Sequence, residues 1–231
     1  MKKGMIFVVS GPSGSGKGTI VRMLVREKGN MFLSTSLTTR GPRPGEVEGD
    51  HYYYVTEEYF KKLIRKKAFL EHARYATKDR YGTLKDPVEE ALNEGKDVIL
   101  EIDVQGAMKV QKQYPDTVLI MLTPTDSDCL ERWLRSRNEN DGAPEEKILQ
   151  RLRRAKDEIL FVPVYDYHVY NKEGRQSECV ELIYSIMQYE HAVKDYVQGN
   201  RKKMSEELKR LYSIATPQRT KYKAEVLDEF K

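Results

Sequence analysis

The sequence predicts an α/β protein, a three-layer fold with a parallel central sheet covered by helices on both faces. Three observations lead to this prediction. A glycine-rich loop joins an apolar run to a helical pattern near the start of the chain, short apolar runs alternate with helical patterns, and residues 32–96 hold short strands where one crossover helix would be ordinary. We therefore expect residues 32–96 to form an inserted subdomain of mixed and antiparallel strands.

The first element is a phosphate-binding loop in its required context. It follows the apolar run 5–9, opens a helical pattern at Ile20, and has the spacing G-x-x-x-x-G-K. Its glycines let successive N–H groups point into one concavity at a helix N-terminus, where the peptide dipoles favour an anion. A plain glycine-rich turn is the alternative, and the complete spacing argues against it. The residues are Gly11, Pro12, Ser13, Gly14, Ser15, Gly16, Lys17, Gly18 and Thr19.

Two residues of this loop bear on phosphate and metal chemistry. The charge of Lys17 can follow the β- and γ-phosphates of a nucleotide. Gly18 stands where Ser or Thr normally offers a hydroxyl to Mg²⁺, so Thr19 or water would have to take that place.

The segment after the first helix reads as short strands and helices. Residues 31–38 and 52–55 are predicted strands, 57–66 a short helix and 69–75 another strand. After a polar turn and residues 81–83, Asp86 is the expected N-cap of a helix that ends near Asn93, with Pro87 in its first turn.

The remaining chain alternates core strands with long helices. Short apolar runs predict strands at 98–102, 118–122 and 169–170, with Asp103 at the carboxyl end of the first. Helical patterns occupy 126–137, 145–160 and 177–197. In the tail, 205–214 has helical spacing, Thr216-Pro217 breaks it, and another helix is expected from Lys221.

Composition narrows the class of protein. No stretch approaches the ~20 apolar residues of a membrane span, and the apolar run after Met1 is interrupted at Ser10 without a cleavage pattern, so we expect a cytoplasmic protein. Cys129 and Cys179 lack metal-ligand spacing and are expected as reduced thiols. The histidines form no ligand pattern either; they are His51, His72, His168 and His191.

The distribution of charge argues against a nucleic-acid partner. The net charge is +4, and residues 199–231 carry nine Lys and Arg against five Asp and Glu, so the body is neutral overall. Arginines in the body therefore need a local explanation, and neither a nucleic acid nor a membrane is expected as a partner.

The segment 36–55, SLTTRGPRPGEVEGDHYYYV, resembles the signature of guanylate kinases. The phosphate-binding loop, Phe69-Leu70-Glu71, Tyr81-Gly82-Thr83 and the segment 99–106, ILEIDVQG, also match, in family order, across residues 4–190. The resemblance implies transfer of the γ-phosphoryl group of ATP to GMP with Mg²⁺, giving ADP and GDP in guanine nucleotide recycling.

The resemblance also implies a division of the chain. A core at 1–31, 97–125 and 160–198 would carry a GMP-binding subdomain at 32–96 and a helical lid at 126–159. Residues 199–231 lie beyond the resemblance and are expected to be a basic, helical extension, whose role and whose effect on oligomeric state the sequence leaves open.

The acceptor of this reaction is already an anionic phosphate, so the chemistry needs dense positive charge and positioning more than a general base. By resemblance, Arg40 and Arg43 make planar contacts to the GMP phosphate, assisted by the hydroxyls of Tyr52 and Tyr81. An exposed basic turn and ordinary strand packing are the alternatives for the arginines and the tyrosines.

Guanine presents N1–H and a 2-amino group as adjacent donors, which a carboxylate can read. By resemblance Glu71 takes this role with Asp103, while Ser36 and Thr83 reach other polar atoms of the base. In isolation Glu71 would be an ordinary strand carboxylate. Asp103 would be a strand-end charge, or a group that orients a Mg²⁺ water.

The lid supplies the remaining arginines. Arg137 and Arg151 match the family's lid arginines and are expected to be catalytic with Lys17 and Arg40, whereas Trp133 stands where the first lid arginine is usual and the loop before Ile148 is longer. Asn171 matches a residue that contacts the adenine of ATP. We expect the other arginines to form a solvated helix face; they are Arg132, Arg135, Arg153 and Arg154.

Two other functions compete with this interpretation. A related P-loop kinase could phosphorylate a different small phosphorylated acceptor, but Glu71, Thr83 and Asp103 are all present. A non-catalytic domain of guanylate-kinase type could bind phosphoproteins, but such domains lose loop or nucleotide residues, and Lys17 and both phosphate arginines remain here.

Overall fold

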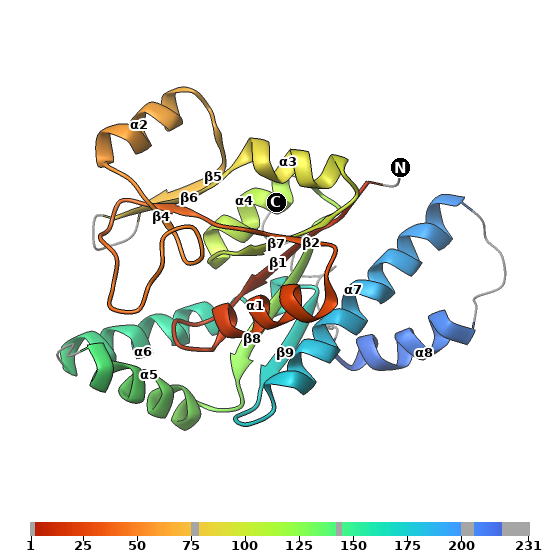
Figure 1. The fold of residues 1–231 in the computed structure, drawn as a ribbon. Helices are drawn as coiled ribbons and strands as arrows, with labels where there is room; N and C mark the ends of the chain where they lie inside the picture. Colours follow the sequence, from red (N-terminus) through yellow and green to blue (C-terminus); the bar gives the residue numbers. More distant parts are fainter. Residues whose placement is uncertain (1–2, 75–78, 142–144, 200–205, 219–231) are drawn as a thin grey trace. The chain divides into compact units, whose positions relative to one another are not determined.

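The structure is a computed structural model that describes residues 3–74, 79–141, 145–199 and 206–218. Its ribbon is shown in Figure 1. The chain forms two compact units, one of Met1–Val8 with Asn30–Thr117 and one of Val9–Gly29 with Val118–Lys231. Among the described residues, no helix is long and apolar enough to cross a membrane.

The predicted parallel sheet is present, with strands in the order β2-β7-β1-β8-β9. Strand β2 pairs in parallel with β7, and β8 pairs in parallel with β9. Every residue of β1 and β8 is buried, as expected for continuous apolar strands covered on both faces. The bounds are β1 Ile6–Ser10, β2 Met31–Ser34, β7 Asp97–Glu101, β8 Val118–Pro124 and β9 Tyr167–Asn171.

The first unit also contains the predicted mixed sheet, in the order β4-β3-β6-β5. Strand β3 pairs in parallel with β4 and antiparallel with β6, which pairs antiparallel with β5. The bounds are β3 Leu37–Thr38, β4 Tyr53–Tyr54, β5 Phe69–Arg74 and β6 Arg80–Leu84.

Helix α2, Glu57–Arg65, covers this sheet with an apolar face. Thr56 caps the helix by accepting a hydrogen bond from the Tyr59 amide. Phe60 is fully buried and stacks on Phe69 of β5, with 4.4 Å between ring centroids. The same cluster buries Leu37 of β3. Strand β3, which leads into residues 40–46 (the arginine-rich turn), therefore packs on a buried core.

Two helices of the first unit correct the sequence-based expectations. Helix α3, Lys85–Asn93, begins earlier than predicted: its N-cap is Leu84, so Asp86 lies in the first turn and the prediction that it caps the helix was wrong. Helix α4, Val104–Gln113, was not predicted. The single strand predicted at 31–38 is two strands, β2 and β3, in different sheets.

The second unit carries the remaining helices. Helices α5 and α6 share a core of Leu130, Leu134, Ile148 and Ala155. Helix α7 contacts both α1 and α8, and Figure 1 shows α7 and α8 as neighbours. The bounds are α1 Lys17–Lys28, α5 Ser127–Asp141, α6 Glu145–Ile159, α7 Gln176–Gly199 and α8 Glu206–Ala215, with short 3-10 turns at Val162–Val164 and Thr216–Gln218.

The tail is described only in part. Helix α8 confirms the helix predicted at 205–214, and its Leu211 and Ala215 are buried. The helix expected from Lys221 lies outside the described residues.

Candidate functional site

The phosphate-binding loop lies in the second unit, between β1 and α1. Gly14 and Gly16 have φ angles of 92° and 82°, in the left-handed region that glycine adopts without strain. A Cβ on Gly14 would lie 2.7 Å from Leu134 Cδ2 of α5, and one on Gly16 would lie 2.4 Å from Asn171 Nδ2. The backbone therefore turns where no larger residue fits.

The loop ends at a helix N-terminus that no side chain caps. Gly16 is the N-cap of α1 and contributes no side-chain hydrogen bond, so the first amides of the helix keep their capacity for an anion. Lys17 Nζ donates to the carbonyls of Gly11 at 2.6 Å and Pro12 at 3.0 Å. Its ammonium thus lies over the loop, next to the positive end of the helix dipole.

Asn171, at the end of β9, is hydrogen-bonded to this loop. Its side chain is buried, and its Nδ2 donates to the Ser15 carbonyl at 2.9 Å. Within the described residues, neither Asn171 Oδ1 nor Ser15 Oγ has a hydrogen-bond partner, although both are buried. The structure therefore places Asn171 against the loop, and its predicted contact with adenine stays a prediction.

The arginines predicted for the lid lie on α5 and α6. Arg151 is half-buried on α6, whereas the side chain of Arg137 on α5 lies outside the described residues. Arg135 is exposed and forms ion pairs with Glu131 and with Glu145, both at 2.7 Å, so it ties α5 to α6 on the surface, as expected of a solvated face.

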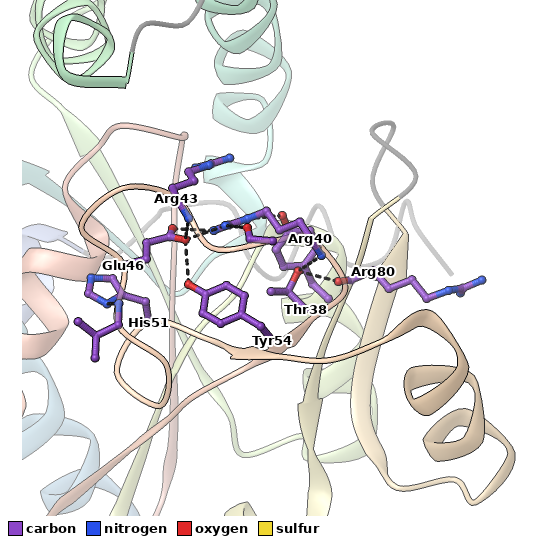
Figure 2. A network of polar contacts seen from close by, with 10 residues as sticks. Thr38, Arg40, Arg43, Glu46, His51, Tyr54 and Arg80 are labelled. Carbon is purple, nitrogen blue, oxygen red and sulfur yellow. Dashed lines mark hydrogen bonds and ion pairs between the residues drawn. The ribbon is translucent and has the colours of Figure 1, made fainter.

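The arginine-rich turn of the first unit holds Arg40 against a carboxylate that the sequence did not single out (Figure 2). Arg40 Nη1 and Nη2 donate to Glu46 Oε2 and Oε1 at 2.7 and 2.6 Å, and Arg40 Nε donates to the Tyr81 hydroxyl at 3.1 Å. Burial opposes both charges, yet their mutual hydrogen bonds raise the pKa of Arg40 and lower that of Glu46 to about 2. Both groups are therefore charged.

Glu46 has two further donors. The Arg43 amide donates to Glu46 Oε2 at 2.9 Å, and the Tyr54 hydroxyl donates to the same oxygen at 2.8 Å. Figure 2 shows the guanidinium of Arg43 pointing away from Glu46, and no hydrogen bond joins it to another described residue. The two arginines thus differ, since one is held by protein groups and the other is exposed.

The predicted phosphate-site tyrosines lie beside Arg40. The Tyr52 ring lies 4.9 Å from the Arg40 guanidinium carbon and 5.7 Å from the Tyr81 ring. Burial, followed by the charge of Glu101, raises the pKa of Tyr52 to about 12, so its hydroxyl stays protonated and able to donate.

The predicted base-reading residues also come together within the first unit. Glu71 of β5 lies opposite Thr83 of β6, whose hydroxyl donates to Glu71 Oε1 at 2.9 Å. Asp103 is the N-cap of α4 and accepts from the Gly106 amide at 2.7 Å. A Cβ on Gly106 would lie 3.0 Å from Glu71 Oε2 and 3.3 Å from Asp103 Oδ1, so a glycine is what admits both carboxylates.

Burial decides the protonation of Glu71. The side chain is almost fully buried, and this burial, opposed by the Thr83 hydrogen bond and reinforced by the charge of Asp103, raises the pKa of Glu71 to about 7. Ser36 is half-buried just before β3, and its carbonyl accepts from the Tyr53 amide at 3.0 Å.

The described residues contain no group of three or more His, Cys, Asp or Glu side chains placed to hold a metal ion. The oxygen donors named for Mg²⁺ are the exposed Thr19, on the first turn of α1, and the Asp103 carboxylate. Both are of the hard type that Mg²⁺ accepts, directly or through water.

Comparisons with known proteins agree over most of the chain. The model of the family described as guanylate kinase matches residues 3–190. The guanylate kinase of Oceanobacillus iheyensis is 40% identical over 89% of this chain and 97% of its own, and that of Lactobacillus johnsonii is 44% identical over 82% and 90%. A crystal structure of guanylate kinase from Anaplasma phagocytophilum matches with a TM-score of 0.66 and 29% identity, covering 82% of this chain and 87% of that one.

Proposed function

Because this chain belongs to the guanylate kinase family, we propose how its own residues perform the family's reaction. The enzyme transfers the γ-phosphoryl group of ATP to GMP and gives ADP and GDP. The observation that carries the assignment of roles is the group formed by buried Glu71 and Thr83 with half-buried Asp103, which lies in the same unit as Arg40 and Arg43.

The donor nucleotide binds at the phosphate-binding loop. Amides of the loop and of the uncapped α1 N-terminus surround the phosphates of ATP, and Lys17 leaves the carbonyls of Gly11 and Pro12 to follow the transferred group. Arg137 and Arg151 stabilise charge that develops on the γ-phosphate. These roles rest on the resemblance and on the loop's geometry.

The acceptor phosphate of GMP binds at the arginine-rich turn. Arg43 offers its exposed guanidinium, Arg40 adds a charge fixed in place, and the hydroxyls of Tyr52 and Tyr81 donate to phosphate oxygens. Positive charge at this point offsets the repulsion between two polyanions, which is the main obstacle to the reaction.

The guanine base is read by buried Glu71 and half-buried Asp103. Ionised Glu71 accepts from N1–H and the 2-amino group, with Asp103 beside it, while Ser36 and Thr83 serve other polar atoms of the base. Burial makes this contact selective. If a base offers no donor to the carboxylate, the carboxylate is removed from water without a compensating hydrogen bond, and binding of that base is weakened.

When bound with ATP, Mg²⁺ would neutralise phosphate charge. Either Thr19 or Asp103 would hold it, directly or through water. We further propose the division into a core at 1–31, 97–125 and 160–198, a GMP-binding subdomain at 32–96 and a lid at 126–159. We place the enzyme in the cytoplasm, with no nucleic-acid or membrane partner.

Identification of the products tests this function. Phosphorus NMR of a mixture with ATP, GMP and Mg²⁺ should show ADP and GDP formed in equal amounts. If ATP is hydrolysed while GMP stays unchanged, or neither is consumed, the assignment is wrong.

Lys17→Met tests whether the phosphate-binding loop takes part in this reaction. It removes the charge that follows the phosphoryl group and keeps a long side chain, so turnover should fall by at least ~10²-fold while circular dichroism and the melting temperature stay near those of the parent protein. Near-normal turnover in a folded variant would exclude the phosphate-binding loop from the reaction.

A further inference from the structure

We propose that Glu46 is a positioning residue of the acceptor-phosphate site: it holds the guanidinium of Arg40 in one plane before GMP arrives. The proposal rests on the function given above, in which Arg40 faces the phosphate of GMP. It assigns Glu46 no contact with the substrate.

The donors of Arg40 are almost all committed within the protein. A guanidinium has five N–H groups. Nε donates to the Tyr81 hydroxyl, Nη1 donates to the Gly41 carbonyl at 2.8 Å and to Glu46, and Nη2 donates to Glu46. These bonds leave one N–H of Nη2 without a partner among the described residues. The bidentate hydrogen bonding of Arg40 is therefore made to Glu46, whereas the guanidinium of Arg43 is left available to bind a phosphate in a bidentate way.

The orientation of Arg40 is fixed from several sides. The backbone amide of Arg40 donates to the Thr38 hydroxyl at 3.3 Å, and that hydroxyl donates to the Arg80 carbonyl of β6. The Tyr52 ring lies along the guanidinium, and the Arg40 side chain is only 10% exposed. Glu46 is the one carboxylate that completes this enclosure in the described structure.

Glu46 itself is held by groups other than Arg40. The Arg43 amide and the Tyr54 hydroxyl both donate to it, and a turn closes where the Glu46 amide donates to the Arg43 carbonyl at 3.0 Å. None of these three contacts involves Arg40. A carboxylate anchored in this way acts as a fixed support for Arg40, and the ordering of a long side chain is completed before substrate binds.

A different role for Glu46 would predict a change in GMP affinity in the opposite direction. If Glu46 were a stand-in for the GMP phosphate that must be displaced, its removal would free Arg40 and tighten GMP binding. If it positions Arg40, removal lets the guanidinium turn toward other acceptors, and GMP binding weakens. The direction of the change in affinity therefore separates the two roles.

The experiment compares Glu46→Gln with Glu48→Gln by calorimetric titration of GMP and by competition with guanosine, which lacks the phosphate. Glu48 is an exposed residue of the same segment and accepts only a long bond, 3.4 Å, from the Tyr54 amide, so its variant repeats the charge change without touching Arg40. We expect Glu46→Gln to weaken GMP about tenfold or more, the loss of one charge-assisted hydrogen bond, and to leave guanosine and ATP unchanged.

A double-mutant cycle links the effect to Arg40. In an Arg40→Met background, Glu46→Gln should change GMP affinity by less than about twofold, because the group that it positions is gone. Glu46→Asp retains the charge with a shorter reach. It is the second variant if Glu46→Gln does not fold, and it should also weaken GMP without affecting guanosine.

Three results would overturn the proposal. They are tighter GMP binding in Glu46→Gln, an equal loss for guanosine and GMP, and additivity with Arg40→Met. A loss in Glu48→Gln as large as that in Glu46→Gln would count against it in the same way, since general charge would then explain both.

Discussion

The carboxyl of Glu71 titrates near neutral pH because the fold removes it from water. Burial raises its pKa to about 7, and the neighbouring Asp103 adds to the shift. The proposed contact of Glu71 with guanine requires the ionised carboxylate, so burial that would make this contact selective would also make it sensitive to pH. The proposed base selectivity and the expected pH dependence of GMP binding therefore both depend on Glu71.

The pH profile of catalysis should report this group. The kcat/KM for GMP reflects the free enzyme, so it should rise about tenfold per pH unit below pH ~7 and level off above it. In Glu71→Gln the side chain cannot titrate, and the rise near pH 7 should disappear. A profile that bends at the same pH in both proteins would assign the titration to another group.

The same shift has a consequence for stability. The pKa of Glu71 is higher in the folded protein than the unfolded value of 4.5, so its contribution is complete below pH 4.5 and is lost as the pH rises through about 7. Above pH 7 the buried charge costs up to roughly 3 kcal/mol. Glu71→Gln should therefore melt at a higher temperature than the parent protein at pH ~8 and at a similar temperature at pH ~4.5.

A stability difference independent of pH would contradict this account of Glu71. Thr83→Val would serve as the comparison, because it removes the hydroxyl that donates to Glu71 without removing a titrating group.

At the scale of elements, the phosphate-binding loop contacts helix α5 at Gly14. Gly14 of the loop lies directly against Leu134 of α5, and Leu134 belongs to the core shared by α5 and α6. A side chain at position 14 would collide with the Leu134 side chain and force it to shift. The packing of α5 and α6 and the shape of the loop therefore depend on each other.

Gly14→Ala tests this contact, with Gly174→Ala as its control. Both glycines have positive φ, 92° and 72°, so both variants should lose roughly 1–3 kcal/mol through backbone strain. Only Gly14 has a neighbour within 4 Å, so only Gly14→Ala should raise the KM for ATP, by ~10-fold or more. Equal ATP kinetics in the two variants would show that the contact is without consequence.

Elements with a strong local pattern could be predicted from the sequence, and those set by tertiary partners could not. The loop 11–19 and the buried strand β8 follow from spacing and apolar runs. Helix α4 escaped prediction because its first turn holds Gly106, whose role is to approach Glu71. The division of 31–38 into β2 and β3 depends on which sheet each half joins, and no local pattern records that.

The same limit applies to the candidate site. Arg40, Glu71, Thr83 and Asp103 were found by their motifs, and the structure groups them within the first unit. Glu46 lies in the same turn as Arg40, but no periodicity or motif in the sequence singles it out. What distinguishes Glu46 is that four donor groups converge on its carboxylate. Its role became visible only from the geometry.

At the scale of the whole molecule, the chain separates two tasks between its units. The first unit holds the residues that we propose bind GMP, and the second holds the phosphate-binding loop and helices α5 and α6, the proposed lid. Phosphoryl transfer requires both nucleotides at once, so neither unit alone can be active. The nearly balanced charge, 40 Lys and Arg against 36 Asp and Glu, means that attraction for polyanions is local to these sites.

We propose that this chain phosphorylates GMP in preference to other nucleotides because buried Glu71 reads the guanine edge. The most direct measurement is kcat/KM for GMP, IMP and AMP with ATP in the parent protein and in Glu71→Gln. We predict a preference for GMP over AMP of roughly 10⁴, with IMP intermediate because it keeps N1–H but lacks the 2-amino group. In Glu71→Gln the amide can face adenine N1, so the preference should narrow. An unchanged GMP-to-AMP ratio in the variant would contradict the account and leave Glu71 as an ordinary strand carboxylate.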